Sequence, residues 1–194
     1  MAENDFVNAE YLKVLTLSRA QIVFLQNQPH SIQLTNILNA QKYALFLADA
    51  KKLKWKQDAV YDIYSYCRAQ LPPIIGLFLS SKEFLFLVSS ITNKKVKKIT
   101  AEITSIGHRD YTLLNDKKKE EKGIMFELEL TSSWSSEWGG YTSFCGNEEE
   151  VLRISPKSNS LTLVQQDQNT QSFIKYVNHN AKNNKRIVVR GFLE

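Results

Sequence analysis

The sequence predicts an α+β protein in which N-terminal helices buttress an antiparallel sandwich, jelly roll or barrel. Apolar residues recur at helical spacing through much of the first half of the chain. The second half instead carries eight short segments that are bounded by turn-forming residues and are typical of strands. We therefore expect residues 1–194 to form a single domain, with mainly helical support and the first strands in residues 1–95 and mainly β structure in residues 96–194.

Three helical segments are expected in the first half of the chain. The first ends near Pro29, and its expected apolar side consists of Leu12, Leu15, Ile22, Val23 and Leu25. The second begins after Asn39, a residue type that caps helices. Its expected apolar side consists of Tyr43, Ala44, Leu45, Leu47 and Ala48. The third covers about residues 74–91, and the stretch SSKE at residues 80–83 marks either a break in it or a capping box.

Strands are expected both before and after the third helical segment. SIQLTNIL alternates like one short strand, and LKWKQDAVYDIYSY alternates like one or two strands with inward-pointing Trp55, Val60, Ile63 and Tyr66. The eight later strands are VKKITAEITSI, DYTLL, GIMFELEL, YTSF, VLRIS, SLTLVQQ, QSFIKYV and RIVVRGFL. We expect the last of them to lie inside the sheet, because its apolar side chains need cover from water.

Composition indicates a globular protein rather than a disordered or membrane-spanning one. Hydrophobic residues make up 43% of the chain, which is enough to bury a substantial core, and the net charge is +5. The lysines cluster at residues 51–56, 94–98 and 117–119, which is typical of solvated turns and leaves an RNA-binding surface as an alternative. Cys67 and Cys145 lack CxxC spacing, and MAENDFVNAEY is no signal peptide, so we expect a cytoplasmic protein.

Three segments of the second half are informative together. They are SSWSSEWGGYTSF, NSLTLVQQDQNTQSFIKYV and KRIVVRGFLE. In this order they resemble the double-stranded β-helix oxygenases that use Fe(II) and 2-oxoglutarate, and most closely the ribosomal-protein prolyl hydroxylase group. The DYTL and FIKYV forms look like the metal-free C-terminal domain of that group. The resemblance implies a cupin-like jelly roll, a protein partner, and a link to the ribosome, to translation or to protein turnover.

The resemblance also implies where the iron ligands would lie. Such oxygenases hold Fe(II) with two histidines and a carboxylate, which leaves open positions for 2-oxoglutarate and oxygen. The matching positions here are Asn115, Lys117 and Ile174. Lysine repels the cation and isoleucine has no lone pair, so we expect neither a metal nor a cofactor. Arg186 matches the arginine that holds the distal carboxylate of 2-oxoglutarate, and its alternative role is a buried ion pair that steadies the last strands.

A second register for the iron ligands uses different residues. His108, Asp110 and His179 spell the order His-x-Asp…His, and Arg190 lies 11 residues after His179. This register predicts an active Fe(II) and 2-oxoglutarate dioxygenase that acts on a protein, but it moves the ligands off the strands that carry them in relatives. In the competing interpretation, His108 is a loop residue and Asp110 bonds the backbone of its own turn.

Large aromatic residues supply the remaining candidate site. Trp134, Trp138 and Tyr141 either pack as core and rim or line a peptide groove. Taken together, these features predict a non-catalytic, oxygenase-like module that binds a protein. The active dioxygenase with Fe(II) and 2-oxoglutarate is the alternative, and a metal analysis separates the two hypotheses most directly.

Overall fold

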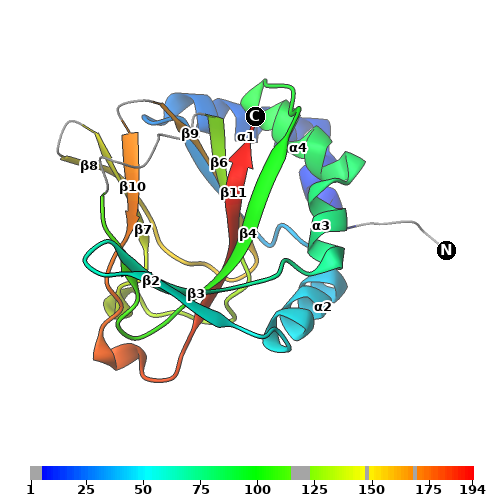
Figure 1. The fold of residues 1–194 in the computed structure, drawn as a ribbon. Helices are drawn as coiled ribbons and strands as arrows, with labels where there is room; N and C mark the ends of the chain where they lie inside the picture. Colours follow the sequence, from blue (N-terminus) through cyan, green and yellow to red (C-terminus); the bar gives the residue numbers. More distant parts are fainter. Residues whose placement is uncertain (1–5, 115–122, 147–148, 168–169) are drawn as a thin grey trace.

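The computed structural model describes residues 6–114, 123–146, 149–167 and 170–194, and these residues form helices beside two sheets (Figure 1). The helices are α1 (Val14–Gln26), α2 (Ala40–Lys51), α3 (Pro73–Leu79) and α4 (Lys82–Thr92), with short 3-10 turns η1 (Ala9–Leu12), η2 (Ser136–Trp138) and η3 (His179–Ala181). The strands are β1 (Ser31–Thr35), β2 (Lys56–Val60), β3 (Tyr64–Ala69), β4 (Ile99–Ile106), β5 (Tyr111–Thr112), β6 (Gly123–Glu129), β7 (Thr142–Gly146), β8 (Glu149–Ile154), β9 (Ser160–Gln166), β10 (Thr170–Ile174) and β11 (Arg186–Leu193).

The two sheets pack face to face. The larger sheet has the order β1-β9-β6-β11-β4-β3-β2, with β5 paired to β3, and the smaller sheet has the order β10-β7-β8. Met125 and Val164 of the larger sheet share a buried cluster with Phe144 and Ile154 of the smaller one. In Figure 1, α2, α3 and α4 lie on the opposite side of the larger sheet from β7, β8 and β10. The expected α+β class, with helices buttressing a jelly roll, is confirmed.

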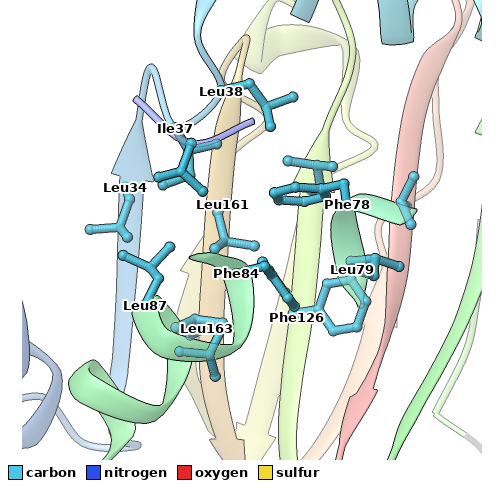
Figure 2. Close-up of a cluster of buried hydrophobic side chains, with 14 of the residues drawn as sticks. Leu34, Ile37, Leu38, Phe78, Leu79, Phe84, Leu87, Phe126, Leu161 and Leu163 are labelled. Carbon is cyan, nitrogen blue, oxygen red and sulfur yellow. The ribbon is translucent and has the colours of Figure 1, made fainter. Parts of the chain in front are cut away.

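The main core lies between the larger sheet and the helices (Figure 2). Phe78 of α3 and Phe84 of α4 are in ring contact at 4.8 Å, and Phe84 meets Phe126 of β6 edge-on at 6.0 Å. Leu87 and Leu163 join them in the same buried cluster. Each such side chain stabilises the fold by about 1.5–3 kcal/mol through burial, so this cluster fixes the helices on the sheet.

Helix α1 buries a different side from the one that its spacing predicted. Leu17, Ala20 and Phe24 are its buried residues. Leu15 and Ile22, which were expected in the core, are instead 64% and 54% exposed. Apolar side chains occur all round this helix, so spacing alone could not select the buried side. The prediction for α1 was wrong for this reason.

Helix α2 likewise turns a different side to the core. Phe46 and Ala50 are its buried residues. The predicted Ala44, Leu45 and Ala48 are exposed. The large ring of Phe46 decides the orientation, because its burial outweighs that of the two alanine methyl groups. The prediction for the apolar side of α2 was therefore largely wrong, although the helix itself is confirmed.

Polar side chains begin two of the helices as the sequence predicted. Asn39 accepts a backbone hydrogen bond at 2.9 Å in the first turn of α2. Ser81 accepts the backbone N–H of Phe84 at 3.2 Å and begins α4 after the break between α3 and α4. No capping box forms there, because the third residue after the N-cap Ser81 is Phe84, which has no carboxylate. The Glu83 carboxylate instead accepts the backbone N–H of Phe6 at 3.0 Å.

The strand predictions are confirmed, including the position of the last strand. β11 lies between β4 and β6 in the middle of the larger sheet. Its neighbouring residues Val188 and Val189 point to opposite faces and are both fully buried. This follows because the helices cover one face of the sheet and the smaller sheet covers the other. Val60 is a correction, since it is exposed on the edge strand β2 rather than turned inward.

Helices α3 and α4 form the most apolar stretch of the chain and meet at a bend of 46°. Only as this bent pair do they reach the length and composition of a membrane span. No single helix in the described part of the chain is long and apolar enough to cross a membrane.

Candidate functional site

A buried arginine at the start of β11 organises the polar part of the candidate site. Arg186 is fully buried and reaches from the larger sheet to β7 of the smaller sheet. Its Nη2 donates to Glu127 Oε2 at 2.9 Å, and its Nε donates to Glu129 Oε2 at 2.8 Å. Its Nη1 donates to the Gly140 carbonyl oxygen at 2.8 Å and to Thr142 Oγ1 at 3.1 Å. We call these residues the Arg186 cluster.

Two carboxyl groups share the single guanidinium of this cluster. Thr142 Oγ1 donates to Glu127 at 2.7 Å, and Thr131 Oγ1 donates to Glu129 at 2.5 Å. Burial opposes ionisation of Glu127, yet Arg186 and Thr142 hold its pKa below the ordinary value of 4.5. For Glu129, burial outweighs Arg186 and Thr131 and raises the pKa above 4.5. Glu127 is thus the better ion partner of Arg186, and Glu129 carries the larger penalty for ionisation.

The guanidinium group has no nitrogen without a protein acceptor. Burial would lower the pKa of Arg186, but Glu129 and Glu127 raise it above its ordinary value, so the side chain stays charged. Each of its three nitrogen atoms donates to an oxygen of the chain. A 2-oxoglutarate carboxylate would have to displace one of the two glutamates. The geometry is that of a buried ion pair, the alternative role considered for Arg186.

Apolar side chains occupy the region where β10 ends. Ile174 is buried there, and its backbone N–H donates to Thr112 Oγ1 at 2.7 Å. The buried residues that pack together, called here the Ile174 cluster, are Ile106, Ile174, Val177, Ala181 and Val188. The partly buried residues packed against this cluster are Tyr66, Trp134 and Trp138. The side chains of the cluster are aliphatic and offer no donor atom to a metal ion.

The paired glycines fasten the aromatic segment to the chain that follows β10. Gly140 and Tyr141 exchange backbone hydrogen bonds with Lys175 at 2.9 and 3.0 Å. Gly139 has a φ of +78°, and a Cβ atom there would lie 2.1 Å from the Tyr176 carbonyl oxygen. A side chain at position 139 would therefore both clash and strain the backbone. Glycine at position 139 thus permits the close approach of this segment to Tyr176.

The three candidate aromatic residues are packed to different degrees. Trp134 donates from Nε1 to the Gly139 carbonyl oxygen at 2.8 Å and meets the Trp138 ring edge-on at 5.3 Å. Both indoles are partly buried against the Ile174 cluster. Tyr141 lies apart from them, with the Arg153 guanidinium 4.4 Å from its ring centre. The tryptophans thus contribute to packing, and their role in a peptide groove stays a prediction.

The second register of iron ligands brings two of its segments together. The Asp110 carbonyl oxygen accepts the backbone N–H of Val177 at 3.0 Å, which brings the turn near the segment of His179. However, the Asp110 carboxylate is buried and accepts hydrogen bonds from Ser65 Oγ at 2.9 Å and from a backbone N–H of its own turn at 2.8 Å. His108 and His179 are exposed. Asp110 therefore has the turn-bonding role of the competing interpretation.

Two positions of the first register lie outside the described residues. They are Asn115 and Lys117. Within the described residues, no group of three or more His, Cys, Asp or Glu side chains is placed to hold a metal ion.

Sequence reasoning missed the two glutamates of the Arg186 cluster. Glu127 and Glu129 belong to GIMFELEL, where they are the acidic residues of an otherwise apolar strand. Their spacing of two residues puts both on one face of β6, and both are buried. A carboxylate is rarely fully buried unless it is paired. Two of them on one face of an apolar strand could have indicated a buried cation.

Comparison with known proteins identifies the family. Residues 48–192 match the family described as "Oxoglutarate and iron-dependent oxygenase degradation C-term". The chain belongs to this family. It is 34% identical over 107 residues to prolyl 3-hydroxylase OGFOD1 of Xenopus laevis, which covers 50% of this chain and 21% of the relative. It is 40% identical over 82 residues to the Mus musculus protein of the same name, which covers 39% of this chain and 14% of the relative.

Solved structures agree with the family at the level of the fold. A prolyl-4-hydroxylase from Pseudomonas putida matches with a TM-score of 0.68 and 12% identity over 92% of this chain and 98% of its own. A 2-oxoglutarate and Fe(II) oxygenase from Burkholderia pseudomallei matches with a TM-score of 0.70 and 10% identity over 92% and 90%. The double-stranded β-helix fold and the resemblance to the prolyl hydroxylase group are confirmed. The chain spans only about a fifth of the length of its OGFOD1 relatives, or less.

Iron and 2-oxoglutarate, which the family name implies, do not fit the described residues of this site. Ile174 has no donor atom and is surrounded by aliphatic side chains. Arg186 is already paired with Glu127 and Glu129, and its single positive charge leaves nothing to balance a further carboxylate. The Asp110 carboxylate of the second register is bound to Ser65 and to its own turn. No reaction step can be built through these groups as they are arranged.

Proposed function

We propose that this chain is a non-catalytic, oxygenase-like module that binds a protein. The observation that carries the proposal is the burial of Ile174 at the position where the resemblance implies the second iron-binding histidine. Its neighbours Ile106 and Val188 are also aliphatic, so they cannot replace the missing ligand. The occupied guanidinium of Arg186 supports the same proposal with respect to 2-oxoglutarate.

The names of the relatives support a protein as the partner. Two relatives are named prolyl 3-hydroxylases, and the solved structure from Trichoplax adhaerens is a prolyl hydroxylase in complex with a peptide fragment of hypoxia inducible factor. A fold that admits a peptide can retain a peptide-binding surface after its metal is lost. We assign that surface to Trp134, Trp138 and Tyr141, because such rings bury a large area while fixing few rotors. We propose a cytoplasmic role that involves the ribosome, translation or protein turnover.

The alternative proposal is an active Fe(II) and 2-oxoglutarate dioxygenase that acts on a protein. It draws its ligands from His108, Asp110 and His179, and the closeness of the Asp110 turn to Val177 favours it. It requires the Asp110 carboxylate to leave Ser65 and to turn outward from a buried position. The cost of breaking these hydrogen bonds is the reason that we prefer the non-catalytic proposal.

Metal binding and turnover together decide between the two proposals. The metal-free chain is titrated with Mn(II) by calorimetry, and conversion of 2-oxoglutarate to succinate is measured with Fe(II) and ascorbate. We expect neither stoichiometric Mn(II) binding nor succinate above the protein-free control, because Ile174 supplies no ligand. His179→Ala is the matched variant, since His179 is exposed and its loss leaves the core intact. Stoichiometric metal binding that His179→Ala removes would overturn the non-catalytic proposal.

A further inference from the structure

Helix α1 carries an apolar stripe that no described part of the chain covers. Its buried residues Leu17, Ala20 and Phe24 face the rest of the molecule, where α1 packs against α4 and β1. On the opposite side, Leu15 and Ile22 are largely exposed although both are aliphatic. Figure 1 shows α1 at the upper rim of the molecule beside α4. A helix that is apolar on all sides is ordinarily buried on all sides, so the outer side of α1 lacks its cover.

The spacing on the outer side matches a seam between two helices. Leu15, Ser18, Ile22 and Leu25 follow one another at intervals of three, four and three residues, which is the a-d-a-d pattern of paired helices. Leu25 is exposed like Leu15 and Ile22. Helix α1 has 13 residues, so the seam is on the order of 20 Å long. These features fit a second helix that lies along α1 rather than an irregular loop.

One unpaired charge flanks this seam. Arg19 follows Ser18, is exposed, and forms no hydrogen bond or ion pair with any residue that the structure describes. Lys13, which precedes the helix, is already paired with Glu10 at 2.6 Å. Arg19 occupies the e position of the heptad, where paired helices place the charges that meet the partner. The surface is therefore complementary to a helix that carries a carboxylate opposite Arg19.

We propose that α1 docks an amphipathic helix of a partner protein, which presents aliphatic side chains to Leu15, Ile22 and Leu25 and a carboxylate to Arg19. This surface is separate from the aromatic segment of residues 134–141, which is fastened to the chain after β10. In Figure 1, α1 lies at the top of the molecule, and the segment after β10, drawn in orange, lies at the bottom. The proposal adds a second contact region and holds whether or not the chain is catalytic.

The charges of α1 argue against other occupants. A second copy of this helix supplies no carboxylate, because VLTLSRAQIVFLQ contains neither Asp nor Glu. In an antiparallel pair of copies the two Arg19 side chains would approach each other, since Arg19 lies near the middle of the helix. Helices that lie on membranes are rich in Lys and Arg along the polar face, whereas Arg19 is the sole cation of α1. A heterologous acidic helix is therefore the better match.

Two synthetic peptides of matched length test the proposal on the full chain. Both carry Leu at the a and d positions, one has Glu at e and g, and the other has Lys there. Like-charge repulsion keeps each peptide from pairing with itself. We expect the Glu peptide to bind about tenfold or more tightly than the Lys peptide, as measured by fluorescence anisotropy. Arg19→Glu should reverse this preference.

Matched variants on the same helix locate the contact. Ile22→Ser should weaken binding of the Glu peptide by about tenfold or more, which is the effect of losing one buried aliphatic side chain. Val23→Ser is the control, because Val23 is also exposed but is turned about 100° away from Ile22 around the helix. Both residues are exposed, so equal melting temperatures check that the fold is unchanged.

Four outcomes would overturn the proposal. They are the absence of peptide binding, equal binding of the Glu and Lys peptides, and equal loss of binding in Ile22→Ser and Val23→Ser. The fourth is a different occupant, seen either as an Ile22-dependent dimer in sedimentation or as tighter binding to vesicles of phosphatidylcholine and phosphatidylserine. A reversal of peptide preference in Arg19→Glu, with the dimer and the vesicle binding absent, supports the proposal.

Discussion

At the scale of single residues, Arg186 shows how a guanidinium can be fully bound by groups of its own chain. Its guanidinium is planar and presents donors in a fork that suits carboxylates. In this chain the carboxylates come from β6, where Glu127 and Glu129 lie two residues apart on one face. Because all three groups are buried, the cluster stabilises the fold only while each charge keeps its partner. The stability of the Arg186 cluster therefore depends on how each of the two glutamates is charged.

The two glutamates should respond differently to loss of charge. We expect Glu127→Gln to lower the free energy of unfolding at pH 7 by about 1.5–3 kcal/mol, the usual value of a hydrogen bond to a charged group. Glu129→Gln should cost less, because burial already raises the pKa of Glu129 and opposes its ionisation. Urea unfolding followed by circular dichroism measures both differences. A larger loss in Glu129→Gln would contradict the assignment of Glu127 as the main ion partner.

The pH dependence of the same variants has a definite sign. The pKa of Glu127 is lowered by folding, so its ionised form adds stability above its ordinary pKa of 4.5 and loses this contribution as pH falls. The difference between the wild type and Glu127→Gln should therefore shrink below about pH 4.5. Glu129 has the opposite sign, since its raised pKa makes ionisation costly as pH rises above 4.5. A gap for Glu127→Gln that is constant with pH would refute this account.

At the scale of elements, backbone contacts hold the aromatic segment as firmly as side chains do. Gly140 and Tyr141 pair with Lys175 as an extension of β7 and β10. Gly139 lets the chain pass close to Tyr176 without a clash. The segment therefore keeps the two tryptophans on the Ile174 cluster by local geometry. A change at Gly139 should disturb this element without removing any side-chain contact.

Two glycine substitutions should move stability in opposite directions. Gly139→Ala puts a methyl group 2.1 Å from the Tyr176 carbonyl oxygen at a positive φ, and we expect a loss of about 1–3 kcal/mol or more. Gly76→Ala is the control, because Gly76 belongs to α3 and no atom apart from its chain neighbours and the nearby backbone of that helix lies within 4 Å of its Cβ position. Alanine favours a helix by about 0.5–1 kcal/mol over glycine, so Gly76→Ala should raise the melting temperature. Equal effects of the two substitutions would contradict the close approach at Gly139.

At the scale of the whole molecule, the helices and the smaller sheet cover opposite faces of the larger sheet. The helices shield one face of the larger sheet, and α1 leaves its outer stripe exposed. The smaller sheet shields the other face and encloses the Arg186 and Ile174 clusters. In the aromatic segment, Trp134 and Trp138 pack against the Ile174 cluster. The proposals place a partner on the aromatic segment or on α1, with the lysine runs of the sequence as the electrostatic alternative, and these three cases differ in their response to salt.

Binding of the proposed protein partner should depend on the aromatic segment more than on charge. We expect Trp138→Ala to weaken such binding by about 2 kcal/mol, because aromatic side chains dominate protein contacts. Lys117→Ala should have little effect at physiological salt, since the lysine runs are expected to raise the encounter rate more than the affinity. Affinity and melting temperature are measured together over a range of salt concentrations. If Trp138→Ala unfolds the protein, Trp138 is a core residue rather than a binding residue. A steep loss of affinity with added salt would favour the alternative of electrostatic binding to RNA.

The sequence alone determined the secondary structure and the family. Alternation and turn residues located the strands, Asn39 marked the start of one helix, and the stretch SSKE marked the break between two others. These features are local, because each depends on neighbouring residues and on backbone geometry. The order of the aromatic, glycine and arginine segments indicated the oxygenase fold. The position of Ile174 likewise argued against an iron site.

Only the tertiary structure decided which sides of α1 and α2 are buried and which groups Arg186 binds. Helix α1 is apolar on both sides, so the choice between Leu15 and Leu17 depends on α4 and β1 rather than on its own spacing. Arg186 meets a glutamate 59 residues earlier in the chain, a pairing that no local pattern contains. Buried polar groups require partners, but folding brings those partners from distant strands. Sequence patterns thus show which elements contain apolar sides and polar groups that require burial or partners. The tertiary packing decides which side is buried and which partner is bound.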